Sequence, residues 1–196
     1  STTIRGRRLY LIEAAEKGMA WMKLQAKGRA GHASMLNDDN AVTRLTAAVA
    51  RIGSHQWPVR LTPTMEVLLA AVGEIAGVQA TPDNAEALVE EFGSAARMIG
   101  AVIRNTANPT MLRSGYKANV IPSEATAAID GRFLPGFEDE FFDTLAALAG
   151  EHVEIEFLTR QDPWQSDFEG PVVAAMTQSL LAAALHNFHE SETRPS

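Results

Sequence analysis

The alternation of hydrophobic and polar positions in the first part of the chain predicts a strand, a loop and a helix. Residues 19–27 alternate with the two-residue period of a half-buried strand, and a polar loop at residues 31–34 follows. One of the polar side chains at 38–40 can cap the next segment, where apolar residues recur at helical spacing until Gly53. These apolar residues are Ala41, Val42, Leu45, Ala48, Val49 and Ile52.

A longer helical stretch and then two strands come next. Between residues 61 and 108 apolar residues recur at helical spacing, and a turn at 82–84 divides the stretch in two. Residues 110–117 and 124–133 are rich in alternating apolar residues, which predicts two strands joined through residues 119–122. We expect these two strands to form an antiparallel pair.

The last predicted elements are two helices with a strand between them. Residues 138–148 form a helix that Gly150 can stop, and residues 152–158 alternate as a strand. Residues 171–185 have the pattern of one more amphipathic helix, and residues 186–196 have the composition of a polar tail.

The order of these elements predicts an α+β fold. Strand, helix, strand, strand, helix, strand is the βαββαβ order of a ferredoxin-like sandwich, a four-stranded antiparallel sheet with two helices on one face. Residues 61–108 would then be a helical insertion. The uncovered sheet face and any edge strand need covering or pairing, which a second copy of the chain would provide. The element order therefore favours a homodimer.

The composition and charge of the 196-residue chain exclude several classes of protein. A net charge of −7 argues against a nucleic-acid binder, because affinity for phosphate comes from Lys and Arg. The absence of cysteine excludes disulfides and cysteine-ligated zinc, and we expect a cytoplasmic protein. No apolar run approaches the roughly 20 residues that span a bilayer. The first residues do not resemble a secretory signal, so we expect no membrane association.

The chain offers little that could hold a metal. None of its five histidines stands in a short zinc-binding motif. His186 and His189, with Glu190 beside them, could share a helix face and bind a metal, although a solvated tail is the simpler interpretation. Glu90 and Glu91 could bridge metals or act in acid–base chemistry, but the helical pattern places them on a polar face. We therefore expect no metal to be bound by this chain.

Three short motifs each place a polar side chain at the end of a predicted strand. His32 follows the first predicted strand, in the sequence GHAS. Asn119 lies in the connection between the second and third strands, in KANVIP, and Arg132 lies at the end of the third strand, in DGRFLPG. A rigid sheet can aim side chains placed in this way. Taken singly, His32 could be an ordinary loop residue, Asn119 a turn former and Arg132 an exposed strand residue.

Together and in this order, the three motifs resemble metallopeptidase family twenty, which includes aminoacylases, carboxypeptidases, acetylornithine deacetylase and succinyl-diaminopimelate desuccinylase. The resemblance covers residues 17–136 strongly. In that family a ferredoxin-like dimerisation domain, or lid, is inserted into a zinc-dependent catalytic domain. The resemblance implies that residues 1–16 are a linker from the catalytic domain, residues 17–160 are the lid, and residues 161–196 return toward the catalytic domain.

The resemblance also implies a role for each of the three polar side chains. His32 would donate a hydrogen bond to the scissile carbonyl in the partner subunit's active site as negative charge develops there. Asn119 would hydrogen-bond the substrate, and Arg132 would bind its carboxylate. The family's zinc-binding motifs and paired catalytic glutamates are not recognisable here. Zinc would belong to the parent enzyme, and we expect the chain alone to be inactive.

The resemblance implies hydrolysis of a small peptide or an N-acyl amino acid by the parent enzyme. The long stretch at residues 61–108 is similar to the larger lids of carboxypeptidase S-like and N-acyl-amino-acid hydrolase members, which favours a carboxypeptidase or an acylase. The alternative is a non-catalytic ferredoxin-like module that dimerises or binds a small ligand. Such a module would not need all three motifs.

Overall fold

The centre of the molecule is a four-stranded antiparallel sheet. The computed structural model describes residues 2–166 and 170–192, with side chains as far as residue 183. The sheet has the strand order β6–β8–β4–β9, which is the ferredoxin-like order, and this confirms the predicted α+β fold. Its strands are Thr106–Ser114 (β6), Glu124–Phe133 (β8), Gly18–Lys27 (β4) and Val153–Gln161 (β9).

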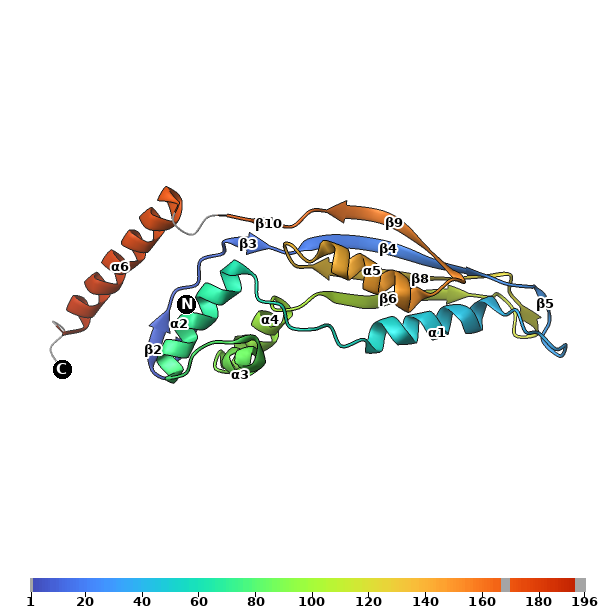
Figure 1. Cartoon of the computed structure of the whole chain (residues 1–196), viewed down its shortest axis with the longest axis horizontal. Helices are drawn as coiled ribbons and strands as arrows, with labels where there is room; N and C mark the ends of the chain where they lie inside the picture. The colour runs from blue at the N-terminus through green and yellow to red at the C-terminus, as the bar shows by residue number, and fades with distance from the viewer. Residues whose placement is uncertain (1, 167–169, 193–196) are drawn as a thin grey trace.

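Two helices, Ala41–Ser54 (α1) and Glu138–Ala149 (α5), pack side by side on one face of this sheet (Figure 1). The Asn40 side chain caps α1 by accepting hydrogen bonds from the backbone N–H groups of Val42 and Thr43. Along β4 every second residue is buried beneath the helices, as the two-residue period predicted. We call the opposite side of the sheet, which the two helices leave uncovered, the open face.

Aromatic rings fill the space between the sheet and the helices. The ring of Phe141 on α5 stacks on Trp57 at 5.1 Å and on Phe133 at 5.5 Å between centroids. Gly131 on β8 lies directly beneath, because a Cβ there would be 2.6 Å from the Phe141 ring. The sheet therefore needs glycine at this position to let α5 approach.

The predicted insertion is present as a small helical layer with its own core. It contains Pro63–Ala76 (α2), Ala85–Glu90 (α3) and Ala96–Ala101 (α4), with 3-10 turns at Pro82–Asn84 (η1) and Gly93–Ala95 (η2). Its core includes Met65, Leu69, Val72, Leu88, Val89, Phe92, Ile99 and Ile103, together with Ile4 from the start of the chain.

The boundary between the insertion and the next strand was predicted wrongly. β6 begins at Thr106, although the helical pattern was expected to extend to residue 108, and it ends at Ser114 rather than at 117. Pro109 stands at a register shift in this edge strand, where a missing N–H is tolerated. Gly115, with φ +66°, turns the chain away early. The proline concealed the strand in the sequence pattern.

Three pairs of very short strands were not predicted. Thr2–Ile4 (β1) pairs with Arg7–Leu9 (β2) in a hairpin at the start of the chain. Ala15–Glu16 (β3) pairs with Trp164–Gln165 (β10), where the chain enters and leaves the sheet. Gly31–His32 (β5) pairs with Val120–Ile121 (β7) at the far tip. Two or three residues are too few to show a period in the sequence.

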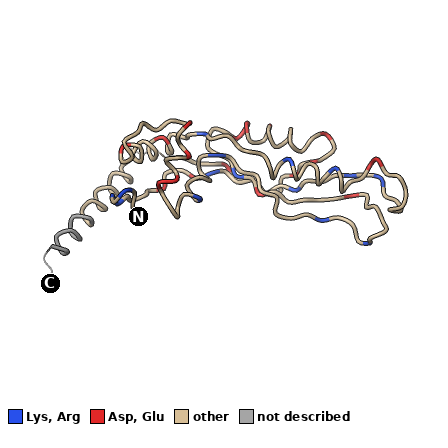
Figure 2. Tube along the Cα trace, turned by 90° about the horizontal axis from the view of Figure 1, so that it is seen from below, with Lys and Arg blue, Asp and Glu red and all other residues tan. Residues whose placement is uncertain are grey.

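The last helix, Pro171–Glu192 (α6), begins where it was predicted but extends farther. Residues 186–192 were expected to belong to a polar tail and are helical instead, while residues 193–196 lie outside the described part of the chain. Within the residues that the structure describes, no helix combines the length and apolar character needed to cross a bilayer. Acidic and basic residues are interspersed along the molecule (Figure 2).

Candidate functional site

His32 and Asn119 lie together at the tip of the molecule farthest from α6 (Figure 1). The β5–β7 pair places His32 opposite Val120, and the backbone N–H of Ala33 donates to the carbonyl of Asn119 at 3.0 Å. Both side chains are exposed to solvent. The structure thus brings together two of the three predicted site residues on one projecting hairpin-like unit.

The hydrogen bonds of His32 determine which ring nitrogen can donate. Nδ1 lies 2.8 Å from the Ser34 hydroxyl oxygen and accepts from the Ser34 backbone N–H at 3.3 Å. A backbone N–H can only donate, so the neutral ring carries its proton on Nε2. Nε2 then has a free donor at the tip, which is the arrangement that a hydrogen-bond donor to a developing oxyanion requires.

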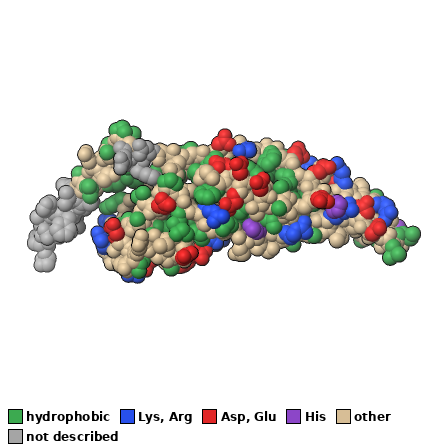
Figure 3. Space-filling model, in the orientation of Figure 1, with side chains coloured by type: hydrophobic (Ala, Val, Ile, Leu, Met, Phe, Trp, Pro, Cys, Tyr) green, Lys and Arg blue, Asp and Glu red, His purple; other side chains and the backbone are tan. Residues whose placement is uncertain are grey.

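The tip also exposes large apolar side chains beside His32. Met35 is 68% exposed, Leu36 is 101% exposed and Tyr116 is 85% exposed. Hydrophobic side chains are visible at this extremity in Figure 3. Apolar groups gathered on a projecting loop favour contact with another protein surface, because water solvates them poorly.

Arg132 lies on the open face of the sheet, near the opposite end. Its Nε donates to Asp130 Oδ1 at 2.7 Å and its Nη2 donates to Oδ2 at 3.2 Å. The indole N–H of Trp21 also donates to Asp130, at 3.3 Å. The hydrogen bonding between Arg132 and Asp130 is the main reason why the pKa of Arg132 is raised, so the guanidinium remains charged. Only two of the five N–H donors of the Arg132 guanidinium are used by Asp130.

The structure does not bring Arg132 together with His32 and Asn119. Glu124 stands at the tip end of β8 and Arg132 is eight residues further along the same strand. At about 3.4 Å per residue, this separates Arg132 from the tip by roughly 27 Å. A single small substrate cannot contact the tip and Arg132 of the same chain.

The comparison with known families identifies the domain. Residues 14–155 match the model of the M20 peptidase dimerisation domain. The chain belongs to this family. The match includes β4, β6 and β8 in full, the first residues of β9 and the helical insertion.

Curated relatives of this M20 dimerisation domain are larger hydrolases. The chain is 28% identical over 165 residues to the N-fatty-acyl-amino acid synthase/hydrolase PM20D1 of Homo sapiens, covering 79% of the chain and 32% of that protein. It is 31% identical over 130 residues to the probable carboxypeptidase S-like 2 of Dictyostelium discoideum, covering 64% of the chain and 25% of that protein. The chain therefore spans about a third or less of these relatives.

Solved structures of the family share the fold of the M20 dimerisation domain. The M20 metallo-carboxypeptidase Sso-CP2 of Sulfolobus solfataricus matches with a TM-score of 0.54 and 19% identity, covering 85% of the chain and 43% of that structure. The di-peptidase Dug1p of Saccharomyces cerevisiae matches with a TM-score of 0.52 and 12% identity, covering 83% and 40%. At these identities the likeness concerns the fold alone.

Lys17 is a half-buried charge of this M20 domain that the sequence did not single out. Its Nζ donates to the carbonyl oxygens of Ala101 at 2.9 Å and Arg104 at 2.8 Å, at the end of α4. Burial, and next the positive charge of Arg132, lower the pKa of Lys17 to about 8. The sequence gives no sign of these contacts, since a lysine before a strand is ordinarily a surface residue.

The lowered pKa of Lys17 predicts a pH dependence of stability. Below pH 8 Lys17 is charged in both the folded and the unfolded chain, whereas between about pH 8 and 10.5 only the unfolded chain keeps the proton. The free energy of unfolding should therefore rise with pH in that window, by at most about 1.4 kcal/mol per pH unit from this group. Urea titrations across the window would measure it. The rise should be smaller in Lys17→Met; equal slopes in the two proteins would contradict the prediction.

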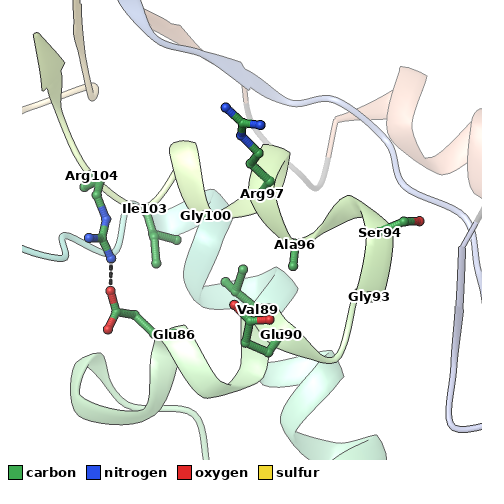
Figure 4. A pocket seen from close by; sticks show the side chains of 10 residues that line it. All are labelled: Glu86, Val89, Glu90, Gly93, Ser94, Ala96, Arg97, Gly100, Ile103 and Arg104. Carbon is green, nitrogen blue, oxygen red and sulfur yellow. Dashed lines mark hydrogen bonds and ion pairs between the residues drawn. The ribbon is translucent and has the colours of Figure 1, made fainter. Parts of the chain in front are cut away.

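The carboxylate pair at Glu90 and Glu91 divides between two surroundings. Glu91 forms an ion pair with Arg5, which attaches the initial hairpin to the insertion. Glu90 borders a hollow of about 710 Å³ between α3 and α4, shown in Figure 4, where Arg104 pairs with Glu86. The two ion pairs join the initial hairpin to the insertion and one part of the insertion to another. They give no sign of acting as a catalytic pair.

Within residues 2–166 and 170–183, no group of three or more His, Asp or Glu side chains could hold a metal ion. The candidate pair His186 and His189 lies beyond the side chains that the structure describes. The described residues thus offer no ligand set that fits the zinc of a metallopeptidase.

Proposed function

We propose that this chain is the dimerisation domain of a zinc-dependent M20 hydrolase that cleaves the amide bond of N-acyl amino acids or small peptides. The family match and the relatives named as carboxypeptidase and N-fatty-acyl-amino acid hydrolase support the reaction class. Zinc, which would activate the attacking water, would be held by the part of the parent enzyme that corresponds to the remaining length of those relatives.

The separation of the three polar side chains is the observation on which the proposal rests. His32 and Asn119 lie at the tip, and Arg132 lies roughly 27 Å away by strand length. In a symmetric dimer the tip of one chain can reach the Arg132 end of the other, and the two-fold axis then creates two equivalent composite sites. Each site would take His32 and Asn119 from one subunit and Arg132 from its partner.

Each side chain would then act on a different part of the substrate. The Nε2 proton of His32 would donate to the carbonyl oxygen as negative charge develops, and Asn119 would hydrogen-bond the substrate beside it. Arg132 would bind the free carboxylate through the N–H donors that Asp130 does not occupy. The guanidinium is oriented before the substrate arrives, so little freedom is lost on binding.

Removal of the guanidinium should affect only substrates that carry a carboxylate. We expect Arg132→Ala in the parent enzyme to lower kcat/KM about tenfold to hundredfold for an N-acyl amino acid, the usual scale for a charged hydrogen bond. The same substrate with its carboxylate replaced by a carboxamide should lose less than about threefold. Steady-state kinetics with both substrates would measure the difference.

Arg113 offers a matched control for this experiment. It is an exposed arginine on the neighbouring strand β6, paired in register with Thr126. Arg113→Ala should leave the kinetics of both substrates unchanged. Equal losses for the carboxylate and the carboxamide in Arg132→Ala would show that Arg132 does not bind the carboxylate.

A further inference from the structure

A cavity of about 720 Å³ lies between the segment that leads into the sheet and the helical insertion. Its walls come from residues 10–17, α2, α4, the turn after β8 and Val173 at the start of α6. Apolar side chains dominate the lining, among them Leu11, Met65, Leu68, Met98, Ile99 and Val102. Two of these lining residues, Met98 at 64% exposure and Leu11 at 42%, present apolar surface to water in this chain.

The cavity begins close to Arg132. Leu134, two residues beyond Arg132, lines it, and two residues of extended chain span roughly 7 Å. Two charged residues of the wall are also electrostatically coupled to the guanidinium: the charge of Glu16 raises the pKa of Arg132, and the charge of Arg132 lowers that of Lys17. The carboxylate site and the cavity are therefore neighbours.

Among the polar side chains of the cavity wall, three already have partners, whereas the buried hydroxyl of Thr64 has none within the part of the chain that the structure describes. The ammonium of Lys17 donates to two carbonyl oxygens of the insertion, and Glu16 accepts from the indole N–H of Trp164 at 2.9 Å. The Thr62 hydroxyl accepts from the backbone N–H of Met65 as the cap of α2. A peptide segment placed here would leave most of its own N–H and C=O groups without partners, which is unfavourable, whereas a hydrocarbon chain needs none.

We propose that this cavity binds the acyl chain of a long-chain N-acyl amino acid whose carboxylate is held by Arg132. The inference rests on the proposed function and specifies its substrate class. A cationic group at one end and an apolar cavity at the other match an amphiphile with one charged head and one hydrocarbon tail. The volume is within the range typical of small-ligand pockets, about 300–1,000 Å³.

The test compares long and short acyl chains in the full-length, zinc-loaded enzyme. Met98→Glu places a charge at an exposed lining residue that is not part of the buried core. Each methylene kept out of an apolar site weakens binding about fourfold. We expect kcat/KM for an N-dodecanoyl amino acid to fall about tenfold or more, and that for the N-acetyl amino acid to change less than about twofold.

Two further variants make the result specific. Val67→Glu, at another exposed lining residue, should reproduce the selective loss. Val78→Glu, at a residue with 49% exposure outside the cavity, should alter neither substrate. Equal losses for both substrates, or no loss in both lining variants, would overturn the acyl-chain assignment; equal losses would indicate instead that another part of the enzyme packs into the cavity.

The outcome for the wild-type enzyme separates this inference from the proposed function. If the enzyme cleaves the N-acetyl substrate and the lining variants keep the chain-length preference of the wild type, the acyl-chain assignment is wrong. The proposed hydrolase function would still stand. If the zinc-loaded wild-type enzyme cleaved neither substrate, nor a dipeptide, the proposed function itself would be wrong.

Discussion

Replacement of His32 by alanine in the parent enzyme is expected to lower turnover by about 10²–10³-fold, the scale of losing one oxyanion donor. The chain supports this expectation with an exposed ring whose Nδ1 accepts from Ser34, so that Nε2 is left to donate. Zinc content should not change, because His32 would not bind the metal. Steady-state kinetics and metal analysis of the same preparation would measure both quantities, and loss of zinc would refute the assigned role.

A matched control is available for the histidine variant. His152 is an exposed histidine in the turn before β9. His152→Ala should retain full turnover, since this side chain is not part of the β5–β7 unit. A similar loss in both variants would indicate a general effect of removing a surface imidazole.

Mixed dimers would show whether the three side chains meet across subunits. A dimer with His32→Ala in one subunit and Arg132→Ala in the other has one site with both changes and one site with neither. Random reassociation of equal amounts gives mixed dimers in about half of the population, so about a quarter of all sites regain wild-type composition. Activity should therefore reappear on mixing. If each site used both side chains of a single subunit, mixing would restore nothing.

Phe141→Ala should have the largest effect on stability. The Phe141 side chain is fully buried, stacks on Trp57 and Phe133, and fills the space above Gly131. Truncation of a buried phenylalanine costs about 3–5 kcal/mol through lost transfer energy and the cavity that remains. Urea unfolding of the chain, followed by tryptophan fluorescence to which Trp57 contributes, would measure the change.

Phe157 is the matched control for the core phenylalanine. It is 51% exposed on β9 and touches only the edge of the aromatic cluster, through Phe142. Phe157→Ala should cost less than about 1 kcal/mol. Comparable losses in the two variants would mean that the ring stack on α5 contributes no more than ordinary surface packing.

The long elements of the fold were predictable because their residues carry a clear period. The strand at 124–133 was predicted with the bounds that the structure gives to β8, and Asn40 was among the residues expected to cap α1. The order of strands and helices then specified the sheet topology. Local pattern was sufficient wherever an element was long enough to bury one complete face.

The features that depend on distant contacts were not predictable. Lys17 is half-buried because the end of α4 and the residues after it, more than eighty residues later, present two carbonyl oxygens to it. The motifs of His32, Asn119 and Arg132 were found in the sequence. Their positions at the two ends of the sheet depend on how the strands pair in register, and a short motif does not show this pairing. Their catalytic and binding roles stay predictions.

The pairing of β3 with β10 has a mechanical consequence. Besides this pair, the Ser166 N–H donates to Ala14 at 2.8 Å and the Trp164 indole donates to Glu16 at 2.9 Å, so both crossings of the chain are tied at one narrow place. β4 runs from there toward the tip for ten residues, about 34 Å. The β3–β10 pair thus marks the point from which the far end of the sheet extends. A rotation of the sheet by about 10° at this point would move its far end, where His32 lies, by roughly 6 Å.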